Sequence, residues 1–172
     1  MILSQLTPKC ALIPSQFHDP SKVRENLASV VCLQEGDEVS SIEIPQYAAV
    51  LLYCSNQGEN ASTLVENDIP GETESLPEMF FILKSLPGCP DYNKILCTWA
   101  DGNLFLAIAQ GASLQLANVY PAADFTTAQY YILLAMKSLQ LNPEVSTICW
   151  RKPISPEDEM SLYRYFKSVS VL

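Results

Sequence analysis

The run "KILCTWADGNLFLAIAQGASLQLANVYP" at 94–121 constrains the fold of this chain most. Three apolar segments are separated by two short turns, which contain Asp101-Gly102 and Gln110-Gly111. Two residues of the Asp-Gly type between alternating apolar segments favour a type I′ hairpin, because both turn positions need a positive φ. The sequence therefore predicts an antiparallel meander with strands at 94–100, 103–109 and 112–119.

A helix and a fourth strand are expected after the meander. Thr126 and Gln129 have the spacing of a capping box and predict a helix over 127–140. Its run "YYILLAM" is apolar nearly all round, which predicts a helix covered on both sides. The apolar segment "VSTICW" predicts a strand over 145–150, parallel to the first strand of the meander through a right-handed crossover.

A last helix is expected over 156–168. Ser155-Pro156 supplies a cap and a first-turn proline, and acidic residues follow. Met160, Tyr163 and Phe166 are predicted to lie on one face of it. The resulting order, β-β-β-α-β-α, is the repeating unit of the actin-like ATPase and ribonuclease-H-like folds.

The first half of the chain has shorter and less regular segments. Ser75 and Glu78 have capping-box spacing before an expected helix, and residues 55–74 resemble a polar, acidic loop with room for a short strand at 63–65. Pro87 to Pro90 is the expected boundary between a partial N-terminal lobe, 1–90, and a C-terminal lobe, 91–172. The remaining expected elements are a strand at 10–13, a helix at 20–31, a strand at 38–44, and a strand or short helix at 46–54.

Charge and composition exclude several classes of protein. The net charge of −9 argues against a nucleic-acid partner, because phosphate binding needs clustered Lys and Arg. No apolar run reaches the roughly 20 residues of a membrane helix, and the N-terminus lacks the pattern of a secretory signal. We therefore expect a cytoplasmic protein. The six cysteines include no Cys-x-x-Cys pair, which argues against zinc and thioredoxin-like chemistry; Cys97 and Cys149 are expected to be buried free thiols.

Several segments resemble a family of uncharacterised bacterial proteins from Bacteroides and its relatives. The resemblance extends over residues 10–168 and includes "ALIPSQF", "IEIPQYAAVLLY" and the run from Leu116-Ala117-Asn118 through Asp124 and Tyr130-Tyr131 to Leu141-Asn142-Pro143-Glu144. The shared positions are hydrophobic and structural. Membership implies an α/β, actin-like ATPase fold with no established activity. Family members carry further strands before the position of Met1, so this resemblance implies a short or partial first lobe.

The phosphate loops of actin-like ATPases provide a test of nucleotide binding. Such loops have the form Asp-x-Gly-x-Gly-Thr at the first hairpin of each lobe, where glycines let backbone N–H groups approach the phosphates. Here the turn contains Asp101-Gly102-Asn103, with one glycine and no hydroxyl. Trp150-Arg151-Lys152-Pro153 stands where a glycine-rich turn would follow the fourth strand. The sequence favours a plain hairpin turn, with a degenerate nucleotide contact as the alternative.

Other candidate groups have ordinary structural interpretations. His18, the only histidine, is expected in a loop beside Asp19-Pro20. Arg151-Lys152 could bind an anion, but two bases after a strand are typical of a surface. The remaining candidates are a carboxylate group in the acidic loop and a tyrosine-rich C-terminal half that could form an interface or pack in the core: Glu66, Asp68, Glu72 and Glu74, and Tyr120, Phe125, Tyr130, Tyr131, Tyr163 and Tyr165.

The sequence thus predicts a non-catalytic protein of actin-like fold that acts through protein–protein interaction. We assign no catalytic, cofactor-binding or metal-binding residue and no cofactor. The alternative hypothesis is an ATP-binding or phosphotransfer protein of the same superfamily with a degenerate nucleotide site. We expect a protein as the partner of this chain. We expect no nucleic-acid partner and no membrane span.

Overall fold

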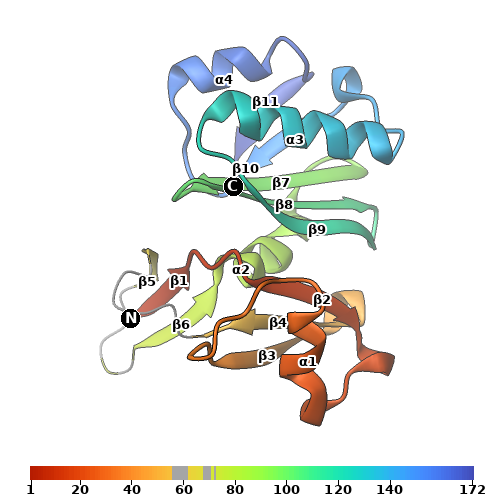
Figure 1. Ribbon diagram of the computed structural model, residues 1–172. Coiled ribbons are helices and arrows are strands. Elements are labelled where there is room, and N and C mark those ends of the chain that lie inside the picture. Colours follow the sequence, from red (N-terminus) through yellow and green to blue (C-terminus); the bar gives the residue numbers. More distant parts are fainter. Residues whose placement is uncertain (56–61, 68–70, 72) are drawn as a thin grey trace. The chain divides into compact units, whose positions relative to one another are not determined.

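The structure is a computed structural model that describes residues 1–55, 62–67, 71 and 73–172 (Figure 1). The chain divides into two compact units, Met1–Phe81 and Ile82–Leu172. Each unit is built around its own β-sheet structure, and each is described by itself below. Among the described residues, no helix is long and apolar enough to cross a membrane.

Two small sheets form the first unit. One has the order β5-β1-β6, in which β1 (Ile2–Gln5) pairs antiparallel with β5 (Thr63–Asn67) and parallel with β6 (Glu74–Pro77). The expected loop at 55–74 therefore contains all of β5 and the first residue of β6. Because Ser75 lies inside β6, the predicted capping box is wrong. Helix α2 (Glu78–Ser85) begins directly after the strand.

The second sheet of this unit has the order β2-β4-β3 and is fully antiparallel. Its strands are β2 (Cys10–Pro14), β3 (Val39–Ile44) and β4 (Ala49–Cys54), so the ambiguous apolar run forms a strand. The predicted helix at 20–31 is shorter than expected: a 3₁₀ turn, η2 (Pro20–Lys22), leads into α1 (Val23–Ala28). Leu27 of α1 packs on Val50 and Leu52 of β4.

A five-stranded sheet forms the second unit, with the order β11-β10-β7-β8-β9. The predicted meander is confirmed as β7 (Asn93–Ala100), β8 (Asn103–Gln110) and β9 (Ser113–Pro121), all antiparallel. Strand β10 (Thr147–Trp150) pairs parallel with β7, as predicted. A further strand, β11 (Ser168–Val171), was not predicted and pairs parallel with β10.

Helices α3 (Phe125–Ser138) and α4 (Pro156–Leu162) lie along the sheet of this unit (Figure 1). Ile132 and Met136 of α3 join the core formed with residues of β7, β8 and β10. The outer face of α3 is open, because Tyr130 is 58% exposed, so the expectation of a helix covered on both sides is wrong. A helix on one face of a sheet needs only one apolar stripe.

The last predicted helix is also corrected. Helix α4 ends at Leu162 rather than at 168, and the chain turns toward β11. Leu162 and Phe166 are buried, whereas Met160 and Tyr163 are exposed. Three apolar residues at helical spacing therefore did not share one face, because the helix had ended before Phe166.

Candidate functional site

The turn at Asp101-Gly102 has the geometry of a type I′ hairpin. Asp101 has φ 53° and Gly102 has φ 69°, and an added Cβ at Gly102 would meet no atom within 4 Å. The Asp101 carbonyl accepts a hydrogen bond from the Asn103 side chain at 3.0 Å, and the Gly102 carbonyl accepts one from the Ala122 N–H at 2.8 Å. Gly102 is thus required by backbone conformation.

The turn after β10, where the sequence lacks the glycine-rich turn of actin-like ATPases, also contains a structural hydrogen bond. The Arg151 N–H donates to the Cys97 carbonyl of β7 at 2.9 Å, which extends the parallel ladder. Arg151 and Lys152 are both half-buried. A phosphate-binding turn needs N–H groups directed at the ligand. The Arg151 N–H is instead directed at the neighbouring strand β7.

The other predicted candidates are dispersed. His18 follows a 3₁₀ turn, η1 (Ser15–Phe17), and its Nδ1 is buried without a hydrogen-bond partner among the described residues. Glu66 lies in β5 and Glu74 in β6, while Asp68 and Glu72 lie outside the described residues. Within the described ranges, no three His, Cys, Asp or Glu residues form a group that could hold a metal ion.

Three of the five predicted tyrosines form a partly exposed aromatic group, whereas Tyr163 and Tyr165 are exposed and lie outside that group. The rings of Tyr120 and Tyr131 stack with their centroids 4.7 Å apart, and Tyr130 meets Tyr131 edge-on at 5.4 Å. Phe125 is buried and packs on Trp99 and Trp150. The group therefore combines core packing with exposed rings.

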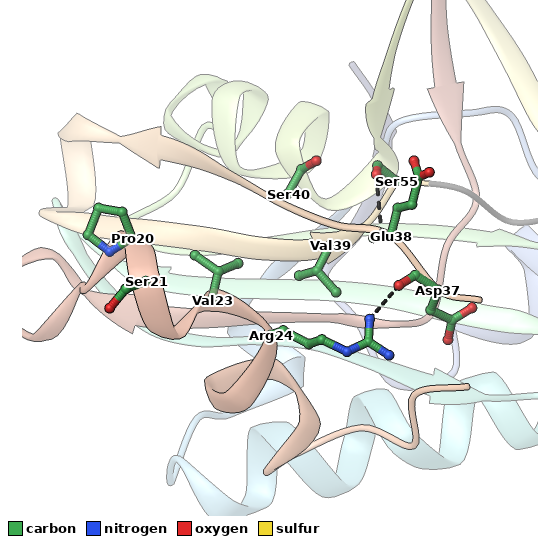
Figure 2. Close-up of a pocket in the computed structure, with 9 residues that line it drawn as sticks. All are labelled: Pro20, Ser21, Val23, Arg24, Asp37, Glu38, Val39, Ser40 and Ser55. Carbon is green, nitrogen blue, oxygen red and sulfur yellow. Dashed lines mark hydrogen bonds between the residues drawn. The ribbon is translucent and has the colours of Figure 1, made fainter. Parts of the chain in front are cut away.

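A groove of about 550 Å³ opens beside α1 in the first unit (Figure 2). It was not predicted from the sequence, because it joins segments that are distant along the chain: η2 and the start of α1, the start of β3, and the residue after β4. Its lining residues are Pro20, Ser21, Val23, Arg24, Asp37, Glu38, Val39, Ser40 and Ser55.

Arg24 fixes one wall of the groove. Its guanidinium donates to the Asp37 carbonyl, as Figure 2 shows, and to the Gln34 carbonyl at 2.8 Å. These bonds tie α1 to the loop before β3. Both bonds go to backbone atoms. The positive charge of Arg24 is therefore used to hold the loop.

Asp37 fixes the same loop from the other side. Its Oδ2 accepts hydrogen bonds from the Lys9 ammonium at 2.6 Å and from the Gln34 N–H at 2.8 Å. These bonds, with the Lys9 bond as the larger cause, hold the pKa of the Asp37 carboxyl below its usual range. The loop is thus held in one conformation by two bases, Lys9 and Arg24.

The groove lies against an open sheet edge. The Ser55 N–H donates to the Glu38 carbonyl at 2.8 Å, so even-numbered residues of β3 bond to β4. The backbone groups of Val39, Ser41 and Glu43 consequently face away from β4. Among the described residues, β3 pairs with β4 on one side and with no strand on its other side. We call this edge, with the adjacent groove, the β3 edge site.

The β9 edge of the second unit provides a contrast. The Ala122 to Gly102 bond sets the register, so the Val119 N–H faces outward. That N–H already donates to the side-chain oxygen of Asn118 at 2.8 Å. A side chain that occupies an outward N–H discourages addition of another strand. The β3 edge and the β9 edge are therefore not equivalent.

The order and pairing of the second unit define an actin-like fold. A solved structure from Bacteroides thetaiotaomicron, described as a protein with an actin-like ATPase fold and unknown function, matches with a TM-score of 0.72 at 14% identity. The match covers 97% of this chain and 66% of that chain. The predicted fold class is confirmed.

The chain belongs to the family described as "Protein of unknown function (DUF3822)", whose model matches residues 6–169. The resemblance to an uncharacterised family of actin-like fold is thereby confirmed. No curated protein matches the chain.

Proposed function

We propose that this protein is a non-catalytic binding protein of actin-like fold, and that it holds an extended basic segment of a partner protein at the β3 edge site. The segment would add to the sheet as a further strand next to β3. Main-chain hydrogen bonds would supply affinity, and alternate side chains would supply specificity.

The distribution of charge carries this proposal. Met1–Phe81 contains twelve acidic and three basic residues, whereas Ile82–Leu172 contains seven of each. The whole net charge of −9 thus belongs to the first unit. An excess of one sign attracts a partner of the opposite sign and speeds its association.

The local arrangement at β3 supports the same partner. Glu35, Glu38 and Glu43 are exposed in or just before the strand, while the bases Lys9 and Arg24 hold the loop beside it. A strand added at this edge would direct every second side chain toward the groove face. Lysine or arginine at those positions would meet carboxylates.

The backbone bonds at Gly102 and Arg151 support the non-catalytic part of the proposal. The Arg151 N–H is bonded to the Cys97 carbonyl, and the carbonyls of Asp101 and Gly102 accept bonds that hold the hairpin turn. Phosphate binding depends on backbone N–H groups that are directed at the ligand. Protein binding needs none of them.

The test uses a synthetic peptide of alternating valine and lysine as the probe. Upon titration, the amide signals of Val39, Ser41 and Glu43 should shift in NMR spectra and gain protection from hydrogen exchange. Ser41→Pro removes one outward N–H without removing a ladder bond to β4. We expect this change to weaken binding by about tenfold or more, which corresponds to about 1.4 kcal/mol.

Ala117→Pro is the matched control, because it places a proline at an outward position of the β9 edge. It should leave peptide binding unchanged, and a peptide of alternating valine and glutamate should bind neither variant. Equal loss of binding in both proline variants, or protection confined to residues outside β3, would refute the β3 edge site.

A further inference from the structure

Two buried cysteines of the second unit lie in contact. Cys89 follows the 3₁₀ turn η4 (Leu86–Gly88), and Cys149 lies in β10; they are 3% and 0% exposed. The Cys89 and Cys149 thiols interact through a side-chain hydrogen bond. The Cys89 sulfur lies 3.9 Å from the Ile95 carbonyl of β7, and Ile95 pairs with Ile148, the residue before Cys149. Both are free cysteines here.

The sheet register explains why these two sulfurs meet and a third does not. In the parallel pair β7–β10, Cys149 stands beside Leu96, and Trp150 stands beside Cys97. Neighbouring residues along a strand point to opposite faces of the sheet. Cys97 therefore belongs to the core face with Trp150, while the side chain of Cys149 lies on the opposite face of the sheet. The sheet backbone separates the side chains of Cys97 and Cys149.

The electrostatic surroundings of Cys149 favour its thiolate. The hydrogen bond with Cys89 lowers the pKa of the Cys149 thiol, and the nearby Lys94 ammonium acts in the same direction, against burial and the charge of Asp91. The same hydrogen bond raises the pKa of the Cys89 thiol. Burial raises the pKa of the Cys97 thiol. A thiolate is the form that reacts with oxidants.

We propose that Cys89 and Cys149 are an oxidation site that closes a reversible intramolecular disulfide, with hydrogen peroxide as the oxidant. The Cys149 thiolate attacks one peroxide oxygen, the O–O bond breaks, and the departing hydroxide takes a proton to become water. The resulting sulfenic acid is attacked by the Cys89 sulfur. A second water leaves with the Cys89 proton, and the S–S bond forms. Two thiols are oxidised by two electrons and one peroxide is reduced to two waters.

Burial selects the oxidant. Both sulfurs are covered, so a small uncharged molecule such as peroxide reaches them by slight local opening, whereas a large disulfide reagent needs wider opening. Exposed Cys32 should instead react with both kinds of reagent. The new bond would tie the segment after η4 to β10 and thereby restrain the unfolded chain. This site is independent of the proposed binding at β3.

The test is peptide mapping of the full chain carrying Cys32→Ser, with and without hydrogen peroxide. Free thiols are alkylated under denaturing conditions before digestion. We expect a linked pair of peptides containing Cys89 and Cys149, its loss upon addition of dithiothreitol, and a higher denaturation midpoint in the oxidised protein. Oxidised glutathione should give far less of the linked pair in the same time.

Two further variants keep the outcome decisive. Cys97→Ala should retain the link, and Cys89→Ala should lose it while remaining folded by circular dichroism, because Cys89 lies outside the strands. The proposal is wrong if peroxide leaves Cys89 and Cys149 fully alkylatable. It is also wrong if the cysteines link in another pairing, or if Cys89→Ala leaves the yield of linked Cys149 unchanged.

Discussion

Two glycines of the meander have the same backbone requirement but different surroundings. Gly102 and Gly111 have φ of 69° and 57°, in the region that costs an ordinary residue about 1–2 kcal/mol. A Cβ at Gly102 would enter open space, whereas one at Gly111 would lie 2.9 Å from Cε2 of the Tyr92 ring. The Gly111 N–H also donates to the Tyr92 carbonyl at 2.8 Å.

Gly102→Ala should therefore lower the free energy of unfolding by about 1–2 kcal/mol, and Gly111→Ala should lower it by more. Urea denaturation followed by circular dichroism measures both changes. The extra loss in Gly111→Ala should disappear when Tyr92→Ala is added, since the close contact is then removed. Equal losses in the two single variants would contradict this account of Gly111.

At the same scale, the roles of the two turn residues were largely predictable. Asp-Gly needs no tertiary information to specify a type I′ turn, so Asp101 and Gly102 were placed correctly. The bonds of Arg24 and Asp37 were not predictable in this way. Their partners are two backbone carbonyls for Arg24 and a lysine far along the chain for Asp37, and no local pattern identifies such partners.

Among the elements, α3 shows how a cap can be misassigned from spacing alone. The predicted cap was Thr126, but Asp124 is the N-cap residue, and its carboxylate accepts a hydrogen bond from the Thr127 N–H at 2.7 Å. That bond is the largest cause of the lowered pKa of the Asp124 carboxyl. Thr126 is exposed in the first turn.

Asp124→Ala should lower the free energy of unfolding by about 1 kcal/mol, because one helix N–H loses its acceptor. Thr126→Ala is the control and should change stability by less than about half of that, since surface substitutions away from caps have small effects. Chemical denaturation of both variants gives the comparison. A larger loss for Thr126→Ala would restore the capping box predicted from sequence.

Short strands that pair with distant partners account for the other errors in predicting the elements. Strands β1, β6 and β11 have four residues each, as β10 does, but they lie in no segment as apolar as the one that marked β10. Each exists because a distant neighbour supplies its hydrogen bonds. The meander needed no such help. Ser75 illustrates the conflict, because pairing with Leu3 places it in a strand despite its capping-box spacing.

For the whole molecule, the fold was predictable because a β-β-β-α-β-α order is encoded in local signals of the second half. The β3 edge site was not, since it depends on which strand lies at an edge and on how charge divides between the two units. The count of acidic residues predicts only that the whole chain is acidic. Only the division into units shows that the first carries the excess.

We propose that this protein of actin-like fold does not bind a nucleotide and acts by binding another protein. A thermal-shift titration with Mg-ATP tests this proposal most directly, since a nucleotide at 100 times its Kd would add about 2.7 kcal/mol to stability. We predict a flat melting temperature up to millimolar Mg-ATP, with Asp101→Asn behaving as the parent protein. A saturable rise that Asp101→Asn abolishes would contradict the account.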